Sequence, residues 1–180
     1  MSSLDLVISA LISGDIIGYP SEGVWGLGCD PNNQSAVKKL LKIKKRSPNK
    51  GFILVGSDMS HLEKFAPTEK YATKLNSTWP GAHTWIFPDS HAPKWITGEK
   101  NSIAMRLSNH PAIISVCDAF FGAIVSTSAN EEGSPPSKSF TEVRKIFPEV
   151  VFLEGRVGNL NGATPIQDIV SDSWIRRGKT

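Results

Sequence analysis

The chain has 180 residues, 39% of them hydrophobic, so it is long enough for a single domain that buries roughly 70% of the surface its unfolded form exposes. Two cysteines are too few for a disulfide framework, so Cys29 and Cys117 are predicted to be core thiols in a reducing compartment. The sequence has neither a basic N-terminal region nor a run of about 18 apolar residues. We therefore expect a soluble, cytoplasmic protein that does not contact a membrane.

The first half of the chain predicts helices and short strands. A periodic apolar run that ends before Gly14 indicates the first helix, with Ser2 and Ser3 as candidate N-caps. The elements expected are a helix over 4–13, strands over 15–20 and 26–29, a helix over 33–45, a strand over 52–56, short helices near 58–65 and 68–77, and a strand within 82–88 that follows a Pro-Gly turn.

The second half continues this pattern. The elements expected are a strand over 102–107, a helix over 110–120 with Pro111 in its first turn, a strand over 123–130, a helix over 139–147, a strand over 150–155, and closing strands over 164–170 and 173–178. Several strands follow one another without an intervening helix. The predicted fold class is therefore α/β, with an open mixed sheet flanked by helices in one domain over 1–180.

Cationic residues are concentrated in one region. No acidic residue lies between Asp30 and Asp58, and seven of the twenty Lys and Arg residues fall within 38–50. Such a region attracts polyanions or phosphate-bearing small molecules. The alternative is an ordinary solvated helix face.

Lys44, Arg46 and Lys50 are the candidates for binding an anion within this region. Counted at about 100° per residue from Val37, Lys44 falls on the apolar stripe of the predicted helix. Its side chain either extends past the helix end into solvent or points into a wet cleft. Arg46 and Lys50 lie in a loop that leads into the next strand, where cations can converge on one anion.

Strand alternation indicates a second polar cluster. In "SIAMRL", 102–107, apolar residues alternate with small or polar ones, so Ser102 and Arg106 lie on one face. In "AIVSTSAN", 123–130, the same alternation places Ser126, Ser128 and Asn130 together. These side chains line either a ligand site or a solvent-facing edge.

Other common motifs are missing from the sequence. The four histidines and two cysteines have no metal-binding spacing, and no serine has a recognisable His and acid partner. In "YPSEGVWGLG", 19–28, the glycine order G-x-x-G-x-G matches neither the dinucleotide fingerprint nor the P-loop. We therefore expect no metal held by a protein motif and no phosphate cradle at this turn.

Five motifs in order resemble the YrdC-like family of threonylcarbamoyl-AMP synthases: "YPSEGVWGLGCDP", "KIKKRSPNKGFILV", "WPGAHTWIFP", "SIAMRLSNHP" and "VSTSAN". The resemblance extends over about residues 5–178. It implies a twisted open sheet around a basic concave cleft, similar to that of a riboflavin-pathway synthase. It also implies an enzyme that joins L-threonine, bicarbonate and ATP into threonylcarbamoyl-AMP and pyrophosphate.

The resemblance also implies roles for particular residues. Those implied to contact threonine are Ser21, Arg106, Ser126 and Thr164. Those implied on the nucleotide side are Lys44, Arg46, Lys50, Ser102, Ser128, Asn130 and Arg176. Lys44 and Arg46 would position and neutralise the reactants, with no residue acting covalently. Mg²⁺ would enter with ATP, and partner proteins would transfer the threonylcarbamoyl group to tRNA beside the anticodon.

Three features depart from the family pattern. Ser21 stands where threonine is usual, a serine separates Arg46 from Pro48, and Glu131 and Glu132 follow "SAN" where the family has uncharged residues. Glu22 either orients its loop or lies near the threonine amine, and the sequence leaves both roles open.

Two other functions compete with synthesis. An RNA-binding module would use the basic cleft to dock tRNA or structured RNA without catalysis, and its binding would weaken steeply with salt. A carbamoyl-transfer relative, of the type found in hydrogenase-maturation proteins, is the third reading, but those domains occur within much larger chains.

Overall fold

Nine strands form one mixed sheet in the computed structural model, which describes residues 1–178. The strands are β1 (Ile17–Pro20), β2 (Trp25–Gly28), β3 (Ile53–Gly56), β4 (Thr84–Phe87), β5 (Ile103–Leu107), β6 (Ile124–Ser128), β7 (Val151–Phe152), β8 (Ile166–Asp168) and β9 (Trp174–Arg176). Their order is β7-β1-β2-β6-β3-β5-β4-β8-β9. Three neighbouring pairs are parallel and five are antiparallel, so the predicted mixed α/β sheet is confirmed.

Helices and short 3₁₀ turns connect these strands. They are α1 (Ser3–Ile12), α2 (Gln34–Ile43), η1 (Met59–His61), η2 (Glu63–Phe65), η3 (Glu69–Tyr71), α3 (Ala72–Asn76), α4 (Lys94–Thr97), α5 (Pro111–Phe120) and α6 (Phe140–Ile146). The two short helices expected near 58–65 and 68–77 are 3₁₀ turns, the second continuing into α3. The prediction missed α4, because four residues are too few to show helical periodicity. None of the helices within residues 1–178 is long and apolar enough to cross a membrane.

Local chemistry explains where the longer helices begin. The Ser2 side chain accepts a hydrogen bond from the Asp5 backbone N–H, and the Asp5 carboxylate accepts one from the Ser2 N–H, which forms a capping box for α1. α5 has Pro111 at its start, where the ring removes no helical hydrogen bond. Both helices therefore start within one residue of the predicted position.

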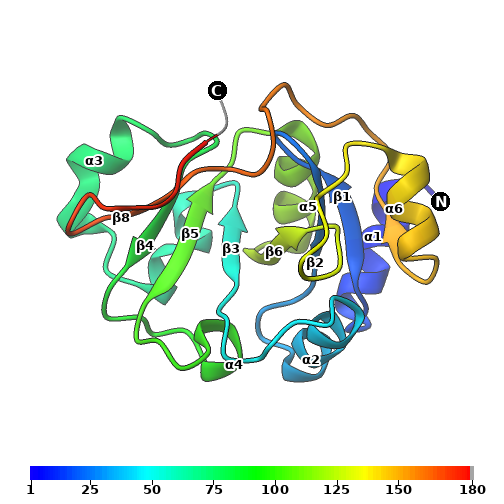
Figure 1. Cartoon of the computed structure of the whole chain (residues 1–180), viewed down its shortest axis with the longest axis horizontal. Helices are drawn as coiled ribbons and strands as arrows, with labels where there is room; N and C mark the ends of the chain where they lie inside the picture. The colour runs from blue at the N-terminus through cyan, green and yellow to red at the C-terminus, as the bar shows by residue number, and fades with distance from the viewer. Residues whose placement is uncertain (179–180) are drawn as a thin grey trace.

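The sheet has a hydrophobic core on each face. Alternation along β3 places Val55 with α1 and α5, and Leu54 in the larger core on the opposite face. The same alternation along β6 places Ile124 with α1 and α5, and Val125 in the larger core. Figure 1 shows α1 and α6 at one side of the sheet, with α3 and β8 at the other. The β3–β6 region therefore lies at the centre of the molecule.

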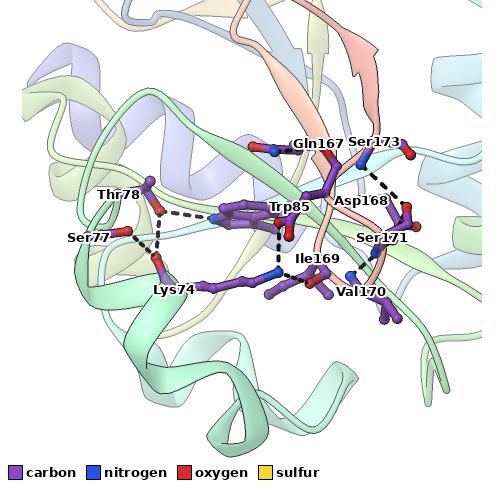
Figure 2. Close-up of polar contacts among 11 residues, drawn as sticks. Lys74, Ser77, Thr78, Trp85, Gln167, Asp168, Ile169, Val170, Ser171 and Ser173 are labelled. Carbon is purple, nitrogen blue, oxygen red and sulfur yellow. Dashed lines mark hydrogen bonds and ion pairs between the residues drawn. The ribbon is translucent and has the colours of Figure 1, made fainter.

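Lys74 of α3 adds side-chain contacts to the C-terminal hairpin of β8 and β9 (Figure 2). The Lys74 Nζ donates to the Ile169 carbonyl oxygen at 2.9 Å and to Asp172 Oδ1 at 2.7 Å. Within the turn, the Asp168 carboxylate accepts from the backbone N–H groups of Val170 and Ser171. The predicted closing pair of strands is therefore confirmed as β8 and β9, and it adds to the sheet edge beside β4.

Candidate functional site

A cavity of about 480 Å³ opens on the sheet between the β1–β2 turn, the loop after α2, and the C-terminal hairpin. It is lined by nine of the eleven predicted site residues: Ser21, Arg46, Lys50, Ser102, Arg106, Ser126, Ser128, Thr164 and Arg176. The other two, Lys44 and Asn130, are not among its lining residues. Residues far apart in the sequence therefore meet at one site.

Charge is distributed unevenly in this cavity. Its cationic lining residues are Arg46, Lys50, Lys100, Arg106 and Arg176, and none of the lining residues is Asp or Glu. A concave surface with charge of one sign concentrates anionic ligands. Lys100 was missed by sequence reasoning, because it lies in the loop before β5, where no periodicity assigns a direction to a side chain. The five cationic lining residues together suit a ligand that carries several negative charges.

The alternation predicted for β5 is confirmed. Ser102 and Arg106 line the cavity with Ala104 between them, whereas Ile103 and Met105 lie in the larger core. Ala104 leaves space above the strand because its side chain is a single methyl group. The face of β5 that was expected to meet a ligand is therefore part of the cavity wall.

Arg106 has a buried acidic partner. Its Nη2 lies 3.2 Å from Glu22 Oε2, and the exposed fractions of the two side chains are 4% and 8%. The Ser108 hydroxyl donates to Glu22 Oε1 at 2.6 Å. Glu22 therefore contacts the residue expected to bind threonine, a pairing that the sequence did not predict because 84 positions separate Glu22 and Arg106.

The glycines of the 19–28 segment allow close packing. A Cβ atom at Gly26 would lie 2.9 Å from the Tyr19 ring, and one at Gly28 would lie 3.0 Å from it. At Gly23 it would lie 2.1 Å from the Gly162 carbonyl oxygen. Each glycine therefore makes room for a neighbouring ring or backbone, which gives this G-x-x-G-x-G pattern a structural explanation.

Two serines, Ser21 and Ser126, line the cavity beside this turn. The Ser21 hydroxyl donates to the Val24 carbonyl oxygen at 2.7 Å, which holds the turn closed. The buried Tyr19 hydroxyl donates to Ser126 Oγ at 2.8 Å. Burial raises the pKa of Tyr19, so this phenol stays protonated and remains a donor. The Ser126 proton is thereby left available to a ligand in the cavity.

Lys44 is buried, as its helical phase indicated, but its ammonium group adopts neither of the two orientations considered from the sequence. Nζ donates to the carbonyl oxygens of Ser128 and Asn130, at 2.5 and 2.6 Å. Burial, with a smaller contribution from nearby Arg46, lowers the pKa of Lys44 to about 8. Lys44 therefore holds the end of β6 from behind the cavity wall.

Arg46 presents its guanidinium group to the cavity. Nη2 donates to the Gly51 carbonyl oxygen at 2.8 Å, and Cζ lies 5.2 Å from the centre of the Phe52 ring. Its buried Nε has no hydrogen-bond partner among the described residues. Burial lowers the pKa of Arg46 from its ordinary value. The loop after α2 therefore supplies a cation that is held by Gly51 and Phe52.

Glu131 and Glu132 contact the cations of the basic loop. Lys45 Nζ lies 2.9 Å from Glu131, and Lys50 Nζ forms a short ion pair with Glu132. The Glu132 backbone N–H also donates to the Lys44 carbonyl oxygen at 2.9 Å. This acidic pair, unexpected from the family pattern, therefore joins the segment after β6 to the loop after α2.

Thr164 and Arg176 complete the cavity on the opposite side. Arg176 donates from Nε and Nη2 to the Thr164 carbonyl oxygen, at 2.9 and 2.6 Å. The Thr164 hydroxyl lies 3.2 Å from that of Thr84 in β4. Within residues 1–178 no cluster of three or more His, Cys, Asp or Glu side chains is placed to hold a metal ion.

The amino-acid sequence resembles those of known proteins along nearly its whole length. The family model Sua5_yciO_yrdC, described as "Telomere recombination", matches residues 9–178. The chain belongs to the Sua5/YciO/YrdC family. Its relatives include the threonylcarbamoyl-AMP synthase of Coxiella burnetii, 42% identical over 97% of this chain and 96% of the relative. The enzyme of the same name from Photobacterium profundum is 42% identical over 99% of this chain and 100% of its own.

A solved structure of the Sua5/YciO/YrdC family has the same fold. The crystal structure of P. abyssi Sua5 complexed with L-threonine superposes with a TM-score of 0.89 at 24% identity, over 97% of this chain. The match covers 54% of that protein. This superposition shows that the two proteins share a fold. The relatives from Coxiella burnetii and Photobacterium profundum are more similar to this chain in sequence, at 42% identity.

Proposed function

We propose that this chain is an L-threonylcarbamoyladenylate synthase, which converts L-threonine, bicarbonate and ATP into threonylcarbamoyl-AMP and pyrophosphate. The observation that carries the proposal is the 42% identity, across nearly the whole of both chains, to relatives named for this activity. The cavity supports it, because five cationic and no acidic side chains line a space of about 480 Å³. The proposal treats residues 1–180 as one YrdC-like domain.

The proposed substrates share this cavity. We propose that Arg106 offers guanidinium N–H groups to the threonine carboxylate, and that the lining residues Ser21, Ser126 and Thr164 also contact threonine. The proposed nucleotide contacts are Arg46, Lys50, Ser102, Ser128 and Arg176. Lys44 and Asn130 support this side indirectly, through their contacts at the end of β6.

The chemistry needs two anions to be held together. Carboxylation of the threonine amine gives a carbamate, whose oxygen attacks the α-phosphorus of ATP while pyrophosphate leaves. Fixed cations stabilise the transition state of this reaction because they offset the repulsion between the carbamate and the triphosphate. The lining residues contain no carboxylate that would hold a metal ion, so Mg²⁺ is proposed to enter bound to the ATP phosphates.

The product implies later partners. Threonylcarbamoyl-AMP is an activated mixed anhydride, and we propose that separate proteins transfer its threonylcarbamoyl group to the adenosine beside the tRNA anticodon. The reaction is assigned to the cytoplasm. Direct RNA binding through the basic surface is a separate expectation, and it would weaken steeply with salt whereas the threonine requirement would persist.

Pyrophosphate release tests the proposed function. The purified protein is incubated with ATP and Mg²⁺, and release is measured with and without L-threonine and bicarbonate. We expect release only when both are present. Release that is independent of threonine, or RNA binding without any turnover, would contradict the proposal.

A further inference from the structure

Glu22 contacts Arg106 from outside the cavity. Arg106 is one of the lining residues and Glu22 is not, although Glu22 Oε2 lies 3.2 Å from Arg106 Nη2. We propose that Glu22 is a positioning residue, which fixes the Arg106 guanidinium group for the carboxylate of the amino-acid substrate. This inference rests on the proposed function, and it assigns a role to an acidic residue in a site whose ligands are anions.

Burial makes this partner necessary. Arg106 is 4% exposed, and a guanidinium ion removed from water is costly unless a counter-ion and hydrogen bonds replace the lost solvation. Glu22 supplies the opposite charge at one edge of the group. Arg106 Nε is itself buried and has no hydrogen-bond partner among the described residues, which leaves the ion pair with Glu22 to offset the burial of this group. A carboxylate that binds an arginine by two parallel hydrogen bonds needs this group in a fixed plane.

Glu22 is itself held by contacts from two other segments. The Ser108 hydroxyl donates to Glu22 Oε1 at 2.6 Å, and Ser108 Oγ accepts from the His110 backbone N–H at the start of α5 at 3.1 Å. The Glu22 carbonyl oxygen accepts from the Leu160 N–H at 2.9 Å. The Glu22 carboxylate is therefore fixed by Ser108 after β5, and the Glu22 backbone is fixed by the segment that leads to Thr164. Both contacts limit the movement of the group that pairs with Arg106.

The Glu22→Gln variant separates positioning from general support of the fold. Glutamine keeps the size of the side chain and an oxygen that accepts from Ser108, but it loses the charge that holds Arg106. We expect the KM for L-threonine to rise by between about 10- and 100-fold, because a misplaced binding group of this kind has effects of that size. The KM for ATP is expected to stay unchanged. Pyrophosphate release is measured with each substrate varied while the other is saturating.

Three further variants sharpen this experiment. Ser108→Ala keeps both charges and removes one donor to Glu22, so a smaller rise in the same KM is expected even if Glu22→Gln folds poorly. Asp15→Asn is the matched control, because it removes an ion pair with Lys39 at the surface, at 2.9 Å, and no threonine effect is expected. With Arg106→Lys in addition, the effect of Glu22→Gln is expected to be much smaller than in the wild-type background, since it acts through Arg106.

The outcomes distinguish this inference from the proposed function. Wild-type protein without threonine-dependent release would contradict both. Wild-type turnover with an unchanged threonine KM in Glu22→Gln and Ser108→Ala would contradict the positioning role alone. Equal increases in the KM for threonine and ATP would also overturn it, since they would indicate general destabilisation. Additive effects of Glu22→Gln and Arg106→Lys would overturn it as well, since they would show that Glu22 acts independently of Arg106. Circular dichroism melting establishes that each variant is folded at the assay temperature.

Discussion

The Lys44 ammonium group donates to the Ser128 carbonyl oxygen at 2.5 Å, which joins the end of α2 to the end of β6. Ser128 lines the cavity and Lys44 does not. In this structure the cation binds backbone oxygens. We propose that it also sets the position of a strand end that carries a proposed nucleotide contact.

Lys44 also predicts a pH dependence of stability. Its pKa is lowered to about 8 in the folded protein, from an ordinary value of 10.5, mainly by burial. Between these values the unfolded chain binds more protons than the folded one, so the free energy of unfolding rises with pH. Relative to Lys44→Met, the wild-type protein should gain on the order of 2 kcal/mol between pH 7 and pH 10.

Urea denaturation of both proteins at several pH values measures this difference. Cys29, Cys117 and Tyr19 have raised pKa values and oppose the trend above pH 9, but they are common to both proteins and cancel in the comparison. A constant difference between wild type and variant across this range would show that Lys44 titrates at its ordinary pKa.

Glu132 is predicted to compete with the nucleotide for Lys50. Lys50 lines the cavity and pairs with Glu132, whereas Lys45 pairs with Glu131 and is not a lining residue. In Glu132→Gln the KM for ATP should fall by about two- to fivefold, which corresponds to the usual strength of an exposed ion pair. Glu131→Gln is the matched control and should leave this KM unchanged. An increase in Glu132→Gln would instead indicate that Glu132 assists nucleotide binding.

Gly23 is predicted to be essential for closing the turn after β1 against the 155–164 segment. A Cβ there would lie 2.1 Å from the Gly162 carbonyl oxygen, so Gly23→Ala should lower the free energy of unfolding by about 1–3 kcal/mol. It should also raise the threonine KM, because Thr164 follows Gly162 closely. Gly122→Ala, whose new atom would be 4.0 Å from its nearest neighbour, serves as the control in chemical denaturation. Equal stability of the two variants would show that the backbone adjusts freely.

Arg106→Ala is predicted to affect both activity and stability. Threonine-dependent turnover should be lost, and the free energy of unfolding should fall by about 3–5 kcal/mol because Glu22 is left buried without its counter-ion. Lys100→Ala removes an exposed cationic residue of the same cavity and should leave stability unchanged. Thermal and urea unfolding measure both variants. An Arg106→Ala protein as stable as wild type would mean that Glu22 is solvated or protonated without cost.

The sequence determined those parts of the fold that depend on local periodicity. The alternation in 102–107 assigned Ser102 and Arg106 to the cavity face correctly, because the opposite face of β5 is buried and a shift by one residue would invert it. Helical phase likewise placed Lys44 on the buried side of α2. Ser21, Thr164 and Arg176 were implied by family resemblance, and the structure brings them to the same cavity.

Only the tertiary structure decided which distant groups meet. Glu22 pairs with Arg106, and Lys44 donates to Ser128 rather than to the cavity, because sheet order brings together segments that lie far apart in the chain. No local pattern encodes these contacts. The side-chain periodicity of a helix or strand indicates which of its residues are buried. The partner of a buried charge is instead decided by how the other strands and helices pack around it.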